Sequence, residues 1–170
     1  RTGEGVINDE DRTVIGNSIP RFTFGLNLGF EYKGFDFSCF FQGVGKADGY
    51  VTMEAIQPMG INGARKEHYK ESFNPQDPKP GAYFPRILSS DYNYAYMSHW
   101  VQDASYIRLK NLQIGYSFKI KGLNQLRVYA SGENLFTATK YRTWDPETPV
   151  GARGFYPNVA VYSMGVNLNF

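Results

Sequence analysis

The last nine residues of the chain alternate between apolar and polar side chains. Small or polar residues occupy the odd positions of this segment, and apolar residues occupy the even ones: Tyr162, Met164, Val166, Leu168 and Phe170. Because successive side chains of a strand point to opposite faces, the pattern predicts a strand with one apolar and one polar face. A strand that ends the chain on an aromatic residue is typical of the closing strand of an outer-membrane β-barrel. A soluble β-sandwich strand can show the same alternation.

Four further segments are predicted to be strands from the same period of two. They cover residues 21–32, 35–42, 106–118 and 126–136. The first is the clearest, because apolar residues hold every even position from Phe22 to Tyr32 and alternate with polar or small ones. Lys33-Gly34 predicts a tight turn to the second strand, since glycine adopts positive φ at little cost. Within that second strand, Phe40 breaks the alternation.

The connections between these segments alternate between long and short, as in outer-membrane barrels with brief periplasmic turns and extended outer loops. The predicted strands are too few to close a barrel, which needs at least about eight. We therefore expect an all-β, antiparallel segment of a larger transmembrane β-barrel, either as a processed product or as a C-terminal fragment. The expected division, all within one partial barrel domain, is 1–20 as an extracellular loop end, 21–42 as a β-hairpin, 43–105 as a long extracellular loop, 106–136 as a second hairpin, 137–158 as an extracellular loop and 159–170 as the C-terminal closing strand.

Charge and motifs exclude several function classes. The formal net charge is +2 without a basic block, which argues against a nucleic-acid partner. Cys39 is the single cysteine, so no internal disulfide is possible, and His68 and His99 have no second ligand at metal spacing. No nucleophile motif or phosphate-binding loop is present, so neither enzymatic activity nor a cofactor is expected. Asp145 and Glu147 flank a proline and are expected to cap or bridge their loop.

The outer half of the third predicted strand carries two cations. Arg108 and Lys110 share the parity of the apolar positions from Leu112 to Phe118, which predicts that both face lipid. Charge is costly at the bilayer midplane and tolerated near the interface, so we expect lipid head groups to neutralise both residues. The alternative is that the strand begins later and that both residues belong to the loop.

Several segments together resemble one protein family. The run from Trp100 to Tyr116, WVQDASYIRLKNLQIGY, resembles the characteristic strand of SusC/RagA-type TonB-linked outer-membrane proteins of the Bacteroidetes. Four other segments are similar and follow in the family's order. They are Ile15-Gly16 with Pro20, Phe40–Gly43, Ser131–Thr137 with Lys140-Tyr141, and the terminal strand ending in Phe170.

This resemblance implies the last five strands of a 22-stranded transporter barrel in the cell outer membrane. Such proteins import oligomeric nutrients, usually glycans or peptides, with energy delivered by TonB, and a SusD-like surface lipoprotein covers the barrel mouth. The implied partners are the remainder of the barrel, the plug, the lipoprotein, outer-membrane lipid, an oligosaccharide or oligopeptide, and TonB through N-terminal parts absent here. Two alternatives stay open: a soluble β-sandwich glycan-binding module, and a structural outer-membrane barrel without transport.

Aromatic residues are frequent in the two long loops. Those selected as candidate substrate-binding or lid-contacting residues are Tyr92, Tyr94, Tyr96, Trp100, Trp144, Phe155 and Tyr156. Flat aromatic faces suit sugar rings and peptide side chains, and they bring a large contact area at little entropic cost. The alternatives are that the rings pack loop against loop or that they dock the lipoprotein lid.

The apolar residues of the last predicted strand form a further candidate site. Tyr162, Met164, Val166, Leu168 and Phe170 resemble the signal that the barrel-assembly machinery binds by strand addition, although the same residues complete the barrel seam in any case.

The segment from Glu4 to Asp11 matches the later half of an EF-hand-like calcium loop. Val6 would give a backbone oxygen, Asp11 the closing carboxylate and Glu4 a weak ligand. Because the upstream ligands are missing or weak, the alternative is a solvated acidic turn without metal.

Overall fold

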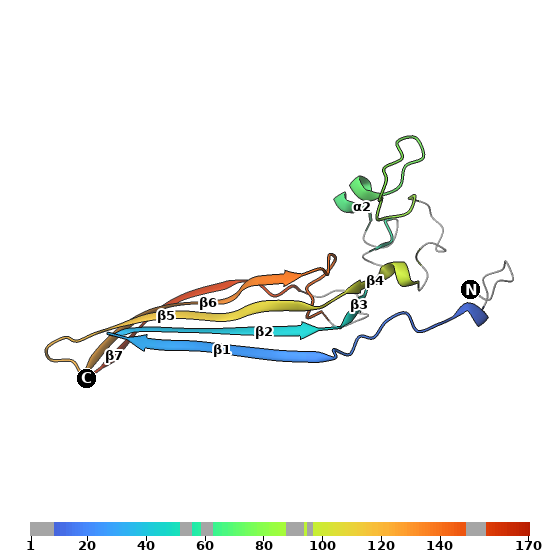
Figure 1. The fold of residues 1–170 in the computed structure, drawn as a ribbon. Coiled ribbons are helices and arrows are strands. Elements are labelled where there is room, and N and C mark those ends of the chain that lie inside the picture. The colour runs from blue at the N-terminus through green and yellow to red at the C-terminus, as the bar shows by residue number, and fades with distance from the viewer. Residues whose placement is uncertain (1–8, 52–55, 59–62, 88–93, 95–96, 149–155) are drawn as a thin grey trace.

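The computed structural model describes residues 9–51, 56–58, 63–87, 94, 97–148 and 156–170, and its main element is an antiparallel sheet. The five strands are β1 (Phe22–Tyr32), β2 (Phe35–Gly45), β5 (Tyr106–Phe118), β6 (Gln125–Thr139) and β7 (Val161–Asn169). They lie in the order β1-β2-β5-β6-β7, so each strand of the sheet pairs with the next one along the chain (Figure 1). The predicted antiparallel all-β fold is confirmed, whereas closure by 22 strands stays a prediction.

The connections separate into two ends of the sheet. Lys33 and Gly34 join β1 to β2 with φ angles of 48° and 89°, which is the left-handed pair that a two-residue hairpin turn requires. The predicted tight turn is therefore confirmed. Residues 119–124 join β5 to β6 at the same end, where β7 also finishes, and the long connections lie at the opposite end (Figure 1).

The long connection between β2 and β5 folds into short elements. β3 (Asp48–Tyr50) pairs with β4 (Val101–Asp103) as a two-stranded ribbon, and α2 (Lys66–Glu71) and η3 (Ser98–Trp100) lie between them in sequence. A further short element, η1 (Asp9–Asp11), precedes the sheet. We call residues 48–51, 56–58, 63–87, 94 and 97–104 the loop cluster. None of the helices in the described ranges combines the length and hydrophobicity that a membrane-spanning helix needs.

Among the described residues, a cluster of buried hydrophobic side chains lies in the loop cluster and includes Tyr141 from the segment after β6, whereas in the sheet strands only Cys39 and Tyr106 are buried hydrophobic residues. The members of this core are Val51, Ile56, Phe84, Tyr94, Trp100, Ala104 and Tyr141. Trp100 has none of its surface exposed, and Tyr94 stacks on it with ring centroids 6.3 Å apart. Residues that are far apart in sequence therefore meet at one end of the molecule, within the long connections of the sheet (Figure 1).

A β-bulge interrupts the alternation in the middle of the sheet. Phe40 pairs with Asn111 and Phe41 with Leu109, so Lys110 is an extra residue in β5. The neighbouring strand β6 is also irregular at this level, where Asn134 has a φ of 52°. An extra residue reverses the parity of a strand. If the alternation seen after Lys110 is extended backwards along β5, it therefore assigns every residue before Lys110 to the wrong face of the sheet.

Candidate functional site

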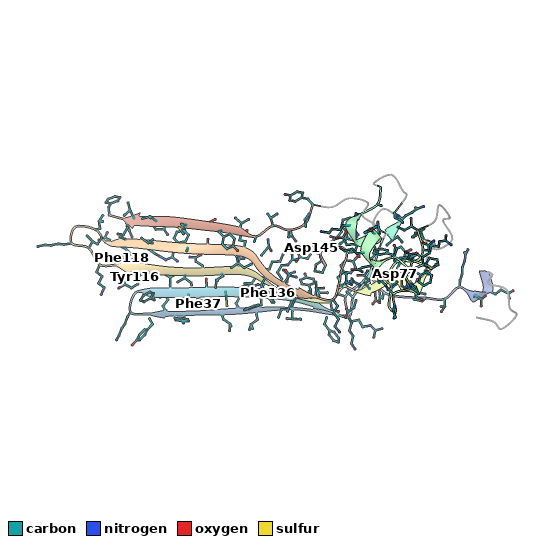
Figure 2. All side chains as sticks on the ribbon, turned by 90° about the horizontal axis from the view of Figure 1, so that it is seen from above. Phe37, Asp77, Tyr116, Phe118, Phe136 and Asp145 are labelled. Carbon is teal, nitrogen blue, oxygen red and sulfur yellow. The ribbon has the colours of Figure 1, made fainter. Side chains whose placement is uncertain are left out.

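One face of the sheet carries apolar side chains on all five strands, and these side chains are exposed. On β1 the exposed fraction runs from 49% to 64%, and Met164 on β7 exposes 90%. We call this the apolar face; its large members are Phe22, Phe24, Leu26, Leu28, Phe30, Tyr32, Phe35, Ile107, Ile114, Phe118, Val128, Phe136, Tyr162, Met164, Val166 and Leu168. Figure 2 shows Phe118 and Tyr116 near the short-turn end of the sheet, followed by Phe37 and then by Phe136 farther toward the loop end. An apolar surface this large marks contact with a membrane or another protein.

Lysines stand at both ends of the apolar row on β1. Lys33 lies over the Tyr32 ring with its Nζ 5.1 Å from the ring centroid, and Lys46 lies over the Phe22 ring at 5.5 Å. Long lysine stems cover apolar surface while the charged head reaches water or head groups. The arrangement is that of an apolar band bounded on both sides by aromatic rings and cations.

The opposite face, which we call the polar face, carries an ion pair that spans three strands. The Nε of Arg127 on β6 donates to Oδ1 of Asp36 on β2 at 2.9 Å, although β5 lies between the two strands. The pair passes over Gly115 of β5, which pairs with Asp36 and with Tyr129. A Cβ at position 115 would overlap the Asp36 carboxylate and come within 2.7 Å of the Arg127 guanidinium. Glycine at this position is what allows the ion pair to form.

A second group of charges lies on the polar face near the loop end of the sheet. Arg108 is 2% exposed, and its guanidinium donates to Glu147 Oε2 and Asp145 Oδ2, both at 2.7 Å, and to Thr137 Oγ1 at 2.8 Å. Lys110 adds an ion pair to Glu147 at 2.8 Å. We call Arg108, Lys110, Asp145 and Glu147 the charge cluster.

The prediction that Arg108 and Lys110 face lipid and are neutralised by head groups is wrong, because both pair with Glu147. The bulge at Lys110 turns Arg108 to the polar face, where it pairs with Gln42 and Thr137 across the sheet. The alternative, that both cations belong to the loop, is also wrong, because both lie within β5. A spacing of three between Leu109 and Leu112, within a run otherwise spaced by two, is the sequence signal that indicates the bulge.

Two positive and two negative side chains balance in the charge cluster. Burial of a guanidinium is costly unless its donors are matched, and here they reach three different side chains. Removing one partner of such a buried pair costs about 3–5 kcal/mol, because the other charge remains buried. The expectation that Asp145 and Glu147 bridge their loop is confirmed, since Glu147 N also donates to Asp145 Oδ1 at 2.9 Å.

The segment after β6, residues 140–148, touches several other parts of the chain, and we call it the strap. Its first anchor is Arg142, whose backbone N–H donates to Gln102 Oε1 of β4 at 2.9 Å. The Arg142 guanidinium also pairs with Glu71 of α2 at 2.8 Å. Tyr141 is buried in the core of the loop cluster. Figure 2 places Asp145 of the strap between the sheet and the loop cluster.

The described members of the predicted aromatic set have different environments. Tyr94 and Trp100 are buried in the core, Trp144 is partly buried beneath the Arg65 guanidinium at 5.3 Å, and Tyr156 is 81% exposed. Tyr92, Tyr96 and Phe155 lie outside the described residues. Burial of two rings agrees with the alternative that loop aromatics pack loop against loop; a role in substrate or lid contact stays a prediction.

Tyr83 is a central residue of the loop cluster that sequence reasoning missed. Its ring contacts Phe84, His99 and Trp100, and the Arg142 guanidinium lies 4.9 Å from its centroid. Burial raises the pKa of the Tyr83 phenol above its usual value, so the hydroxyl stays neutral. An open hollow of about 520 Å³ beside Tyr83 is lined by aromatic and aliphatic side chains, including Phe73, Met97 and His99.

The remaining predicted sites are only partly described. Among the candidate calcium ligands, Glu4 and Val6 lie outside the described residues, and Asp11 ends η1. No group of three or more histidine, cysteine or acidic residues suited to a metal occurs within the described ranges. The candidate assembly residues from Tyr162 to Leu168 project from β7, which pairs with β6 along one edge, and Phe170 follows the strand with 83% of its surface exposed.

Comparison with known proteins finds relatives along nearly the whole chain. The TonB-dependent receptor P3 of Formosa agariphila is 35% identical over 99% of the chain and 18% of its own length. The TonB-dependent receptor SusC of Bacteroides thetaiotaomicron is 27% identical over 100% of the chain and 17% of its own length. No family model matches.

Solved structures of the RagAB peptide importer share the fold. The open-open state superimposes with a TM-score of 0.71 at 25% identity, covering 91% of the chain and 18% of the importer chain. The chain thus spans about a fifth of the length of the relatives it matches. Sequence likeness over the full chain and a matching antiparallel sheet lead to the same family. The chain belongs to the SusC/RagA-type TonB-dependent receptors, of which it represents a C-terminal segment.

Proposed function

We propose that the chain forms part of the wall of an outer-membrane barrel that imports oligomeric nutrients. The observation that carries this proposal is the exposed apolar face on all five strands, opposite a face that holds ion pairs. In a membrane barrel, the apolar face contacts acyl chains and the polar face lines the interior. A soluble sandwich would bury the same apolar residues beneath a second sheet.

Strand dimensions support a transmembrane orientation. A tilted strand of about 9–11 residues crosses the hydrocarbon, and β1 and β2 each have 11 residues. The short turns then face the periplasm, and the loop cluster lies outside the cell. The Lys33–Tyr32 and Lys46–Phe22 contacts mark the two interfaces, where aromatic girdles and cations are expected.

The proposal also covers the substrate and the partners of the whole receptor. Among the relatives, RagAB is described as a peptide importer, and SusC is described as a TonB-dependent receptor. We propose an oligomeric glycan or peptide as substrate, a SusD-like lipoprotein over the outer mouth, and energy from TonB through parts of the receptor outside this chain. Trp144 and Tyr156 remain candidates for contact with substrate or lipoprotein. The role is transport and binding, without chemical conversion.

Site-specific fluorescence in lipid tests the orientation directly. The full-length receptor would carry Cys39→Ser and a single new cysteine labelled with a small fluorophore, then be reconstituted with brominated lipids. Labels at Leu26 and Met164 should be quenched, and labels at the neighbouring Asn27 and Ser163 should not. Equal quenching at adjacent positions, or recovery of the receptor in the aqueous fraction without detergent, would overturn the membrane assignment and favour the soluble glycan-binding module.

Growth experiments separate transport from a purely structural barrel. Deletion of the receptor gene should abolish growth on one class of polymer, either oligosaccharide or oligopeptide, as sole nutrient, and leave growth on the corresponding monomer unchanged. Co-purification of a surface lipoprotein with the tagged receptor would identify the partner. Unchanged growth on every oligomer tested would contradict import and favour a structural role.

A further inference from the structure

We propose that the strap is a mechanical link, clamped by Arg108, that couples the outer loop cluster to the polar wall of the sheet. The inference rests on the proposed function for its setting, because the polar face lines the barrel interior only if the sheet spans a membrane. Arg108 is in this scheme a positioning residue that acts through Asp145 and Glu147.

At the sheet, the strap is held by the buried guanidinium of Arg108. Three donors of Arg108 reach Thr137 on β6 and both strap carboxylates, so one side chain fixes the strap against the sheet. The Tyr106 hydroxyl adds a hydrogen bond to Glu147 Oε1 at 2.9 Å, and Lys110 pairs with the same carboxylate. Glu147 is thus held by three side chains of β5, which makes it the main anchor at this end.

The outer end of the same nine-residue segment is held by a different set of contacts. The Arg142 guanidinium pairs with Glu71 of α2, and its backbone binds Gln102 of β4. Gln102 also donates to Thr143 Oγ1 at 3.2 Å. Only two residues separate Arg142 from Asp145, so displacement of α2 or β4 is passed on to the charge cluster over a very short length of chain.

The ion pairs at the two ends of the strap differ in exposure, so one end is held more firmly than the other. Arg108 and Asp145 expose 2% and 8% of their side chains, whereas Arg142 and Glu71 expose 57% and 37%. Exposed ion pairs contribute little to stability because water competes for both charges. Removing one partner of a buried pair is strongly destabilising. The Arg142–Glu71 pair therefore breaks more readily than the Arg108 pairs, which keep the strap against the sheet. Tyr141 holds the start of the strap in the core of the loop cluster.

Hydrogen exchange of the full-length receptor in detergent tests the clamp. Arg108→Met should raise amide exchange in residues 141–148 at least tenfold, and should also raise it in β4 and α2, because both are held through the strap. Asp36→Asn/Arg127→Met serves as the matched control, since it removes an ion pair from the same face at the other end and should leave strap exchange unchanged.

A milder variant keeps the test informative if Arg108→Met fails to fold. Lysine preserves the charge at position 108 but lacks the planar fork that reaches three acceptors, so Arg108→Lys should give an intermediate increase. Conversely, Glu71→Gln/Gln102→Leu should raise exchange in α2 and β4 and leave residues 145–148 protected.

Two results would overturn the proposal: unchanged strap exchange in both Arg108 variants, or a strap released without any change in α2 and β4. Either result is independent of the lipid-quenching experiment, which tests the membrane setting in the unmodified protein. Failure of the link and failure of the membrane assignment are therefore distinguishable.

Discussion

The ring of Tyr141 on the strap lies against the backbone of Gly49 in β3. A Cβ at position 49 would come within 2.7 Å of the Tyr141 ring carbons, so the contact exists only because this position has no side chain. Tyr141 is 8% exposed, and burial raises the pKa of its phenol above the usual value. The strap therefore begins inside the core of the loop cluster before it reaches the charge cluster on the sheet.

Gly49→Ala should destabilise the loop cluster by about 1–3 kcal/mol, because the added methyl group forces the Tyr141 ring out of its site. Gly45→Ala is the matched control, since its nearest contact would be the Phe22 side chain at 3.7 Å, an ordinary van der Waals distance. Limited proteolysis of the intact receptor, followed at the loop end, measures the difference. Equal protease resistance of the two variants would contradict the close packing.

The Asp36–Arg127 pair should show a coupling energy of about 0.5–3 kcal/mol in a double-mutant cycle of Asp36→Asn and Arg127→Met, measured by urea unfolding in lipid vesicles. In a Gly115→Ala background the coupling should fall close to zero, because the new methyl group occupies the path of the pair. A coupling that persists in that background would show that the two side chains meet by another route.

Leu26→Arg should cost about 2–4 kcal/mol of barrel stability if Leu26 faces the bilayer midplane. Asn27→Arg, one residue away on the polar face, should cost much less because its charge enters the hydrated interior. Unfolding of the reconstituted receptor and its heat-modifiable gel mobility report both effects. Similar costs at the two positions would argue that neither face contacts acyl chains.

Trp100→Ala should cost about 3–5 kcal/mol in local stability, since Trp100 is fully buried among Tyr94, Phe84 and Tyr83. Tyr156→Ala, at an exposed ring, should change stability by less than about 0.5 kcal/mol. Proteolysis measures the stability of the loops, and binding of candidate oligomers measures recognition. If Trp100→Ala weakens oligomer binding while the loops stay intact, Trp100 has a direct role in substrate contact.

Much of the sheet can be predicted from the sequence, because strand alternation and turn geometry depend on residues that are close together in the chain. Strict alternation from Phe22 to Tyr32 and the Lys33-Gly34 turn specify a hairpin without reference to the rest of the chain. The same local rule fails at Arg108, because one extra residue at Lys110 reverses the parity of everything before it. Attention to the irregular apolar spacing between Leu109 and Leu112 corrects this error from the sequence alone.

The loop cluster was far less predictable, because its contacts join residues separated by long stretches of chain. Glu71 meets Arg142, and Gln102 meets both Tyr83 and Thr143, and no periodic pattern connects these positions. Loop aromatics such as Trp100 and Tyr94 could be selected as important from their type, but their burial depends on the tertiary packing of several segments. Tyr83 has no distinguishing feature in the sequence and is revealed only by its neighbours.

In the proposed orientation, the tightly packed part of this segment lies beyond the end of the sheet, where water and not hydrocarbon is the surrounding solvent. Its cohesion therefore comes from the ordinary hydrophobic effect, whereas the strands depend on the thickness and composition of the bilayer. We therefore expect transfer of the receptor from a native membrane to detergent to act on the strands and to leave this packing in place. A loop cluster that faces the cell's surroundings, as proposed, would thereby be insulated from changes in lipid.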